Sequence, residues 1–182
     1  MELVQSHVLM DEAAINRALI RISHEIVEHN GGLENVAVIG IQKRGVPLAT
    51  RIRNTLEEIE GIQVPMGILD ITFYRDDLST LSAHPVVHAT DIPFNVNDKK
   101  IVLIDDALFT GRTTRAAIEN IFDMGRPENI QLAILIDRGH RQLPFRADYV
   151  GKNIPTSLSE HIDVEVKEVD GQDRVLLLKE AN

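Results

Sequence analysis

The chain has 182 residues, of which 43% are hydrophobic and none is cysteine, and its formal net charge is −9. These values are typical of one globular domain with a sizeable core, and the lack of cysteine excludes disulfide and thiolate chemistry. The negative charge excludes a generally basic protein that coats nucleic acid, although a single basic patch stays compatible with it.

The N-terminal half of the sequence predicts helices and strands in alternation. Glu2 and His7 interrupt the apolar run that a signal peptide needs, and no later stretch reaches membrane-spanning length, so we expect a cytoplasmic protein. Asp11 is suited to cap a helix whose apolar residues recur at helical spacing until Gly31. The next predicted elements are a buried strand over 36–41, a helix that follows 45–47 and stops at Gly61, and a strand over 64–73.

The C-terminal half continues this alternation after a long irregular stretch. Residues 74–100 show little periodicity, which predicts a lid or a flexible hairpin. Strand, helix and strand alternation predicts an α/β fold with a parallel sheet and right-handed crossovers. The remaining predicted elements are strands over 101–104 and 131–136, a helix over 112–124, and a small C-terminal hood with strands over 164–169 and 174–178.

The most informative segment runs from Ile101 to Thr114. Its apolar start predicts a buried strand that leads directly into Asp105 and Asp106, at the carboxyl end where open α/β sheets bind ligands. The Thr-Gly-Arg-Thr sequence over 110–113 would begin a helix and offer backbone N–H groups and hydroxyls to a phosphate. Carboxylates for sugar hydroxyls beside amides for a phosphate predict a site for a phosphorylated sugar. The alternative is a strand followed by a surface turn, with Asp105 and Asp106 as a helix cap.

A second polar segment follows the strand predicted over 36–41. Lys43 and Arg44 lie there between Gly40 and Gly45. One interpretation is a polyphosphate cradle, in which the glycines let the backbone approach the ligand and the two cations supply charge. The alternative is a connecting loop with solvated charges.

Two further segments carry polar side chains after predicted strands. Arg75 opens the irregular stretch, and as part of a lid it would close on a phosphate and exclude water. The alternative for Arg75 is a solvated turn. The cluster over 137–141 contains Asp137, Arg138 and His140, and it would contact the edge of a base or form a charged surface loop.

Together these segments resemble the type I phosphoribosyltransferases. The acid pair Asp105-Asp106 with the sequence over 110–113 is similar to their phosphoribosyl pyrophosphate motif. The resemblance narrows to the bifunctional pyrimidine operon regulators, in which one protein is both a transcriptional attenuator and a uracil phosphoribosyltransferase. It covers nearly the whole chain, from Asp11 to about Leu178. The segments that carry this narrower resemblance are 69–72, 74–78, 137–141 and 149–157.

The resemblance implies a fold, a reaction and a cofactor. Residues 1–182 would form a single domain with a central, mostly parallel, twisted sheet flanked by helices, a flexible lid at about 74–100 and a hood at about 138–182. Uracil and phosphoribosyl pyrophosphate would give UMP and pyrophosphate. Mg²⁺ would be held mainly by substrate oxygens and water near Asp105 and Asp106, without dedicated protein ligands.

The resemblance also implies roles for individual residues. Asp105 and Asp106 would hold the ribose hydroxyls and, with the lid residue Arg75, form the catalytic set. The backbone near 160–162 in the hood would face uracil. The residues implied in substrate binding are Lys43 and Arg44 at the pyrophosphate, Ala107, Leu108 and Phe109 before the phosphate loop, Thr110, Gly111, Arg112, Thr113 and Thr114 around the 5′-phosphate, and Arg138 and Ile162 at uracil.

The family's second function is RNA binding. A basic face of a homodimer or higher homo-oligomer would bind a stem-loop in a leader mRNA, and UMP or UTP would tune this binding. Candidate RNA-binding residues are Arg17, Arg21, His24, His140, Arg141, Arg146 and Lys152. The first three share one helix face, for which a solvated surface is the alternative.

Other functions fit parts of the sequence. A nucleotide-sensing RNA-binding attenuator would use the same pocket without turnover, and a purine phosphoribosyltransferase would lack RNA binding. Turnover with uracil, and competition among uracil, hypoxanthine and guanine, separate these alternatives. A phosphoacceptor signalling domain would need acidic residues where Lys43 and Arg44 stand, so we set it aside.

Overall fold

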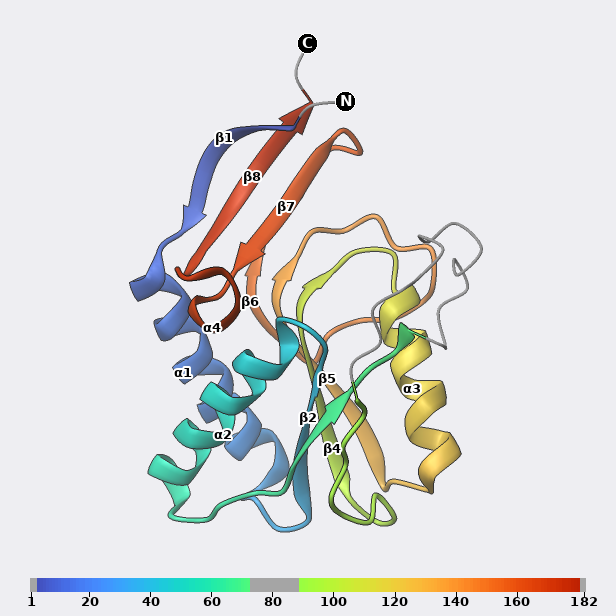
Figure 1. The fold of residues 1–182 in the computed structure, drawn as a ribbon. Coiled ribbons are helices and arrows are strands. Elements are labelled where there is room, and N and C mark those ends of the chain that lie inside the picture. The colour runs from blue at the N-terminus through green and yellow to red at the C-terminus, as the bar shows by residue number, and fades with distance from the viewer. Residues whose placement is uncertain (1–2, 73–88, 181–182) are drawn as a thin grey trace.

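The structure is a computed structural model that describes residues 3–72 and 89–180 (Figure 1). A five-stranded sheet forms its centre, with all neighbouring strands parallel and the order β3-β2-β4-β5-β6. The predicted α/β fold with a parallel sheet is therefore confirmed. The strands are β2 (Val36–Ile41), β3 (Met66–Leu69), β4 (Lys100–Leu108), β5 (Asn129–Asp137) and β6 (Tyr149–Asn153).

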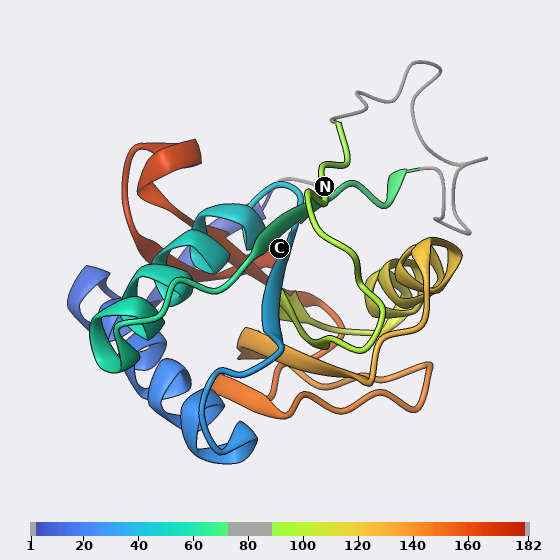
Figure 2. The same ribbon diagram turned by 90° about the horizontal axis from the view of Figure 1, so that it is seen from below.

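Helices cover both faces of this sheet, as Figures 1 and 2 show. Helices α1 (Glu12–Asn30) and α2 (Gly45–Glu60) lie on one face, and α3 (Arg112–Met124) lies on the other. Because successive strand residues point to opposite faces, β4 divides its apolar side chains between two cores. Val102 and Ile104 pack with α1 and α2, whereas Ile101 and Leu103 pack with α3.

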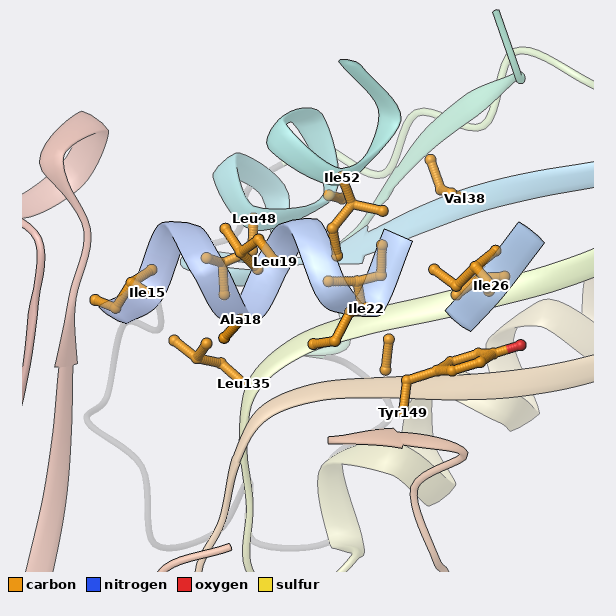
Figure 3. Close-up of a cluster of buried hydrophobic side chains, with 14 of the residues drawn as sticks. Ile15, Ala18, Leu19, Ile22, Ile26, Val38, Leu48, Ile52, Leu135 and Tyr149 are labelled. Atoms are coloured by element: carbon orange, nitrogen blue, oxygen red, sulfur yellow. The ribbon is translucent and has the colours of Figure 1, made fainter. Parts of the chain in front are cut away.

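The core between α1, α2 and the sheet buries the apolar face that the sequence predicted for the first helix. Its side chains at helical spacing, among them Ile15, Leu19 and Ile22, are almost fully buried between α2 and the sheet (Figure 3). The Asp11 side chain caps the helix by accepting a hydrogen bond from the Ala14 N–H at 2.8 Å. The cap and the predicted first helix are confirmed.

A second, antiparallel sheet has the order β1-β8-β7 and rises beside the carboxyl ends of the central strands (Figure 1). It contains the N-terminal strand, which the sequence did not predict, because β1 is defined by pairing with the far end of the chain. Its elements are β1 (Leu3–Met10), β7 (Glu160–Glu165), the short helix α4 (Lys167–Asp170) and β8 (Arg174–Glu180).

Two of the predicted strand boundaries are wrong. The strand expected over 64–73 is only β3, because the Asp70 side chain accepts hydrogen bonds from the N–H and hydroxyl of Thr72 and turns the chain. The strand expected over 164–169 ends at Glu165. Asp170 folds back onto the backbone N–H of Val166 at 2.9 Å and forms α4 instead.

The predicted hood and lid also differ from the structure. Within the hood range 138–182, β6 pairs with β5 in the central sheet, so the hood proper is the small sheet with α4. Residues 74–88 of the predicted lid lie outside the described residues. Residues 89–99 belong to the packed body, because Asp91 bridges to Ile68 and Val96 is buried. No described helix has the length and apolarity needed to cross a membrane.

Candidate active site

The carboxyl edge of the central sheet brings together the polar segments that follow β2, β4 and β5. Parallel strands end at the same edge, so the loop over 42–45, the acid pair and the cluster over 137–141 become neighbours. Asp105 and Asp106 lie within β4 instead of after it, since β5 extends the ladder and pairs Leu108 with Asp137. The sequence placed these residues at the right edge but ended the strand too early.

The acid pair is half-buried and electrostatically costly. Asp105 accepts a hydrogen bond from the Asp106 N–H at 2.9 Å, and Asp106 accepts one from the Ala107 N–H at 2.8 Å. Burial raises the pKa of Asp105 well above its usual value, and the charge of Asp106 raises it further. Burial also raises the pKa of Asp106, although hydrogen bonds and the charge of Arg44 oppose the rise. Hydroxyl donors or a cation would relieve this cost.

The loop between β4 and α3 is shaped to hold an anion. Gly111 caps α3 with a φ of 93° and has no side chain to cap the helix, while the Thr110 hydroxyl accepts a hydrogen bond from the Arg112 N–H at 3.4 Å. The N–H groups at such a helix N-terminus favour a phosphate. The loop is braced from outside, because the Thr110 carbonyl accepts hydrogen bonds from the N–H groups of Gln142 and Leu143 at 2.9 and 3.0 Å. A Cβ atom on Gly111 would lie 3.1 Å from the Phe145 ring.

The other members of this predicted loop lie in different surroundings. Leu108 and Thr114 are buried, Ala107, Phe109, Thr110 and Thr113 are half-buried, and Arg112 is exposed. The Leu108 side chain belongs to the core beside α3, so only its backbone is available to a ligand. Arg112 donates a hydrogen bond from Nε to the Gln142 side chain at 3.0 Å.

The loop after β2 places two cations beside the acid pair, but its glycines serve packing. A Cβ atom on Gly40 would lie 2.7 Å from the Gly45 carbonyl oxygen. One on Gly45 would lie 2.5 Å from the Ile104 carbonyl oxygen. The glycines therefore allow α2 to approach β2 and β4 closely. Lys43 is exposed, and its peptide bond with Gln42 is cis.

Arg138 links the phosphate loop to the hood. It is 7% exposed, and its guanidinium lies over the Phe109 ring, 4.0 Å from the ring centroid. Its Nη2 donates to the Glu160 carbonyl at 2.7 Å, and its Nε donates to the Thr156 hydroxyl at 3.1 Å. These two bonds use two of the five N–H donors of Arg138, the residue implied at uracil. Ile162 is half-buried in β7 and packs against the core.

A cavity of about 430 Å³ opens at the carboxyl ends of β5 and β6. Its lining includes residues predicted for both base and RNA binding. The lining residues are Asp137, Arg138, Gly139, His140, Arg141, Asn153, Pro155 and Thr156. In the described ranges, no three metal-ligating side chains cluster, so no protein cage for a metal is formed there.

Two of the predicted RNA-binding residues, Arg21 and Arg141, bond to backbone carbonyls of other elements. Arg21 donates to the Gly151 and Val150 carbonyls at 2.6 and 3.1 Å, which joins α1 to β6. Arg141 donates to the Phe145 and Phe109 carbonyls and pairs with Asp137. Both guanidinium groups therefore hold the fold together. The other five residues are exposed: Arg17 and His24 on α1, and His140, Arg146 and Lys152 near β6. Among them, the His140 ring hydrogen-bonds with the Thr156 carbonyl, and Lys152 Nζ donates to the Leu9 carbonyl at 3.3 Å.

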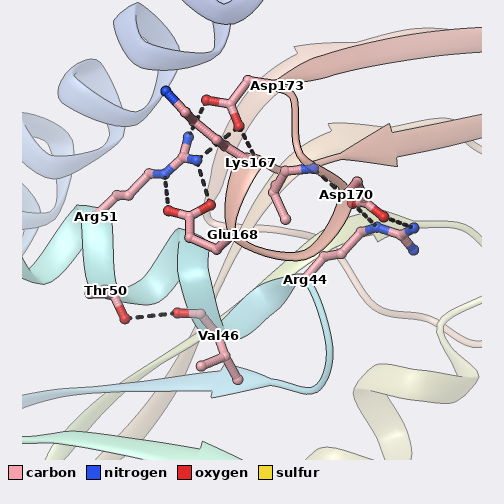
Figure 4. Close-up of polar contacts among 9 residues, drawn as sticks. Arg44, Val46, Thr50, Arg51, Lys167, Glu168, Asp170 and Asp173 are labelled. Carbon is pink, nitrogen blue, oxygen red and sulfur yellow. Dashed lines mark hydrogen bonds and ion pairs between the residues drawn. The ribbon is translucent and has the colours of Figure 1, made fainter.

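Sequence analysis missed Asp170, and it assigned Arg75 to a segment outside the described residues. Asp170 lies on α4, and its carboxylate pairs with Arg44 at 2.9 Å through both oxygens (Figure 4). The two residues are 126 positions apart, so no local pattern could have indicated the pair.

Comparison with known proteins matches these features to one family. A family profile described as a phosphoribosyl transferase domain matches residues 8–169. The Bifunctional protein PyrR of Caldicellulosiruptor bescii is 63% identical over 169 residues, which are 93% of each chain. That of Clostridioides difficile is 57% identical and covers 96% of this chain and 99% of the relative. A hypoxanthine phosphoribosyltransferase structure from Trypanosoma cruzi has a TM-score of 0.76 at 17% identity over 96% of each chain, a likeness of fold.

Proposed function

The chain belongs to the phosphoribosyl transferase domain family, and we propose that it is a uracil phosphoribosyltransferase that also regulates a pyrimidine operon. The observation that carries the catalytic part is the half-buried acid pair on β4, followed directly by the uncapped N-terminus of α3. Together they match a pentose that bears a 5′-phosphate. The high identity to bifunctional PyrR proteins supports the second, regulatory part.

The reaction joins uracil to phosphoribosyl pyrophosphate and gives UMP and pyrophosphate. The bond from the anomeric carbon to the pyrophosphate oxygen breaks, and a bond to a uracil nitrogen forms as that nitrogen loses its proton. Positive charge then develops on the sugar, and the Asp106 carboxylate would stabilise it. The first turn of α3 would fix the 5′-phosphate, so the protein contributes mainly by positioning.

The leaving pyrophosphate requires cations. Lys43 and Arg44 follow β2 at the same edge as the acid pair and would bind it. Carboxylate oxygens are suitable ligands for Mg²⁺, and Asp105 with Asp106 would help to hold this ion near the substrate. When bound, Mg²⁺ supplies charge neutralisation on the pyrophosphate.

The base that the protein accepts distinguishes a uracil phosphoribosyltransferase from a purine phosphoribosyltransferase. The purified protein would be incubated with phosphoribosyl pyrophosphate, Mg²⁺ and uracil, hypoxanthine or guanine in turn, and the nucleotide formed would be measured. We expect UMP from uracil and little product from the purines. Purine nucleotide formation without UMP would favour the purine enzyme, and tight UMP or UTP binding without turnover would favour the non-catalytic attenuator.

The regulatory function would use the exposed basic residues of α1 and the segment around β6 in a homodimer or higher oligomer. A leader mRNA stem-loop would bind this face in the cytoplasm, and UMP or UTP in the active site would change the affinity. The test is a titration of labelled leader RNA with and without each nucleotide. Affinity equal to that for an unrelated RNA of the same length would contradict the proposal.

A further inference from the structure

The short helix α4 is fastened to α2 by arginines from two positions (Figure 4). Arg51 pairs with Glu168 at 2.6 and 2.9 Å and with Asp173 through two bonds of 2.8 Å. The Asp173 carboxylate is only 4% exposed, and it also accepts the N–H of Lys167 at 2.6 Å. These contacts anchor α4 against the helix α2.

Arg44 makes a separate contact to the same short helix. Its Nε donates to Asp170 Oδ2 and its Nη2 donates to Asp170 Oδ1, both at 2.9 Å, which is the parallel geometry of a strong arginine–carboxylate pair. Asp170 is itself fixed, because Oδ2 also accepts the N–H of Val166 at 2.9 Å. This arrangement holds the guanidinium in one orientation, whereas a free arginine side chain samples many rotamers.

The orientation leaves the other end of the guanidinium open. Within residues 3–72 and 89–180, Arg44 Nη1 has no recorded hydrogen-bond partner. Arg44 is close enough to Asp106 for its charge to lower the pKa of that carboxyl group. The guanidinium therefore stands between the hood and the acid pair, with one edge bonded to Asp170 and one edge available to a ligand at the carboxyl edge of the sheet.

We propose that Asp170 is a positioning residue, which fixes Arg44 so that its free edge meets the pyrophosphate group of the substrate. This inference rests on the proposed function. Because Arg51 with Glu168 and Asp173 already anchors α4, the Asp170 pair is not required to hold the hood in place. Its effect is to order the pyrophosphate loop before substrate binds, so that binding does not bear the conformational cost of ordering Arg44.

The test compares Asp170→Asn with Glu168→Gln. Both variants remove one carboxylate charge from α4, but only the first alters the partner of Arg44. For Asp170→Asn we expect the KM for phosphoribosyl pyrophosphate to rise about tenfold, with the KM for uracil within about twofold of the parent. Glu168→Gln should lower thermal stability and leave both KM values unchanged. Asp170→Glu keeps the charge and should restore most of the affinity.

A double-mutant cycle with Arg44→Gln tests whether Asp170 acts through Arg44. Asp170→Asn should add less than about twofold to the KM when Arg44 is already replaced. An equal tenfold effect in both backgrounds, or a KM for phosphoribosyl pyrophosphate that Asp170→Asn leaves unchanged, would overturn the proposal. If Asp170→Asn does not fold, Asp170→Ser takes its place in the same cycle, with the same expected and contradicting outcomes.

Failure of the proposed function and failure of the role proposed for Asp170 give different experimental results. If the parent protein binds phosphoribosyl pyrophosphate in calorimetry but makes no UMP, the enzyme assignment fails, and the binding constants of the variants still decide the role of Asp170. If the parent turns over normally and the variants match it, only the positioning role is lost. If the parent neither binds nor turns over, both proposals are wrong.

Discussion

At the residue scale, the acid pair has properties that its sequence position alone does not explain. Two adjacent carboxylates on one strand would ordinarily point to opposite faces and avoid each other. Here both lie at the end of the buried part of β4, and burial raises the pKa of each. An electrostatic cost of this kind is typical of sites whose ligand compensates for it.

Replacing Asp106 by Asn should remove the charge that supports the developing positive sugar. We expect uracil turnover to fall by roughly 10²–10³-fold, the usual range for one lost electrostatic contact at a reacting centre. Initial rates of UMP formation measure this. Glu34→Gln, at an exposed carboxylate away from this edge, is the control and should keep the parental rate. Wild-type kinetics in Asp106→Asn would refute the assignment.

Replacing Asp105 by Asn should make stability less sensitive to pH. Because the folded pKa of Asp105 lies above its ordinary value of 3.8, the folded state binds more protons than the unfolded state between these values. Stability therefore falls as the pH rises through that interval, so the raised pKa of Asp105 lowers the stability of the fold at pH 7 relative to acidic pH. The variant should be more stable than the parent at pH 7.

Urea denaturation at several pH values checks this prediction. The advantage of Asp105→Asn should shrink as the pH falls toward the ordinary value of the carboxyl group. Asp170 and Asp173 have lowered pKa values and act with the opposite sign, but they are common to both proteins and cancel in the difference. An advantage that grows on acidification would contradict the assigned direction.

At the element scale, the position of α2 depends on a glycine contact. A Cβ atom on Gly45 would meet the Ile104 carbonyl oxygen at 2.5 Å, closer than real atoms approach. The start of α2 carries Arg44 and follows Lys43, so a shift of this helix would move both cations relative to the acid pair. The placement of the pyrophosphate loop therefore depends on how closely the first turn of α2 packs against β4.

Gly45→Ala should cost about 2 kcal/mol of stability through overpacking and should raise the KM for phosphoribosyl pyrophosphate. The control is Gly61→Ala, at the end of the same helix. Gly61 has a φ of 68° and open space around it, so alanine there should cost about 1 kcal/mol and leave the KM unchanged. Chemical denaturation and substrate kinetics measure both. Equal KM values in the two variants would show that Gly45 does not affect the binding of phosphoribosyl pyrophosphate.

At the scale of the whole molecule, two sheets built from distant parts of the chain meet at the active edge. The N-terminal strand β1 pairs with the C-terminal strand β8, so both ends of the chain belong to the hood (Figure 1). Arg138 connects this hood to the phosphate loop through Glu160 and Phe109. Arg138 therefore links the hood to the loop proposed to bind the 5′-phosphate.

Arg17 is the suitable residue for testing the RNA surface. It is exposed on α1, and Arg17→Ala should weaken leader RNA binding and reduce the salt dependence of log K by about one, as expected for one lost phosphate contact. Uracil turnover and thermal stability should not change. Filter binding across a salt series measures this. An unchanged salt slope would remove Arg17 from the RNA-binding set.

Arg21→Ala, on the same helix face, would not be an equivalent test. Arg21 bonds to the carbonyls of Val150 and Gly151 and links α1 to β6, so its loss should cost about 1 kcal/mol of stability. Weaker RNA binding by Arg21→Ala would then have two causes. The pair of variants separates a phosphate contact from a structural one.

Features that depend only on neighbouring residues were predictable before folding was considered. The Asp11 cap and the helix that follows it, the wholly apolar strand β2, and the acid pair leading into a Gly-containing helix start are all local patterns. Helix capping, hydrophobic periodicity and turn chemistry act over a few residues, and for this reason they were predictable. The family was predictable on the same basis, because its motif is contiguous.

The tertiary structure alone decided which charged side chains are available to ligands. Arg44, Arg21 and Arg141 are alike in the sequence as cations after strands or on helices, but each is bound to a partner that folding brings close. Arg44 meets Asp170 across 126 positions, and Arg21 meets Gly151 across 130. The physical reason is that an ion pair or hydrogen bond is specified by distance in space, to which separation along the chain is no guide.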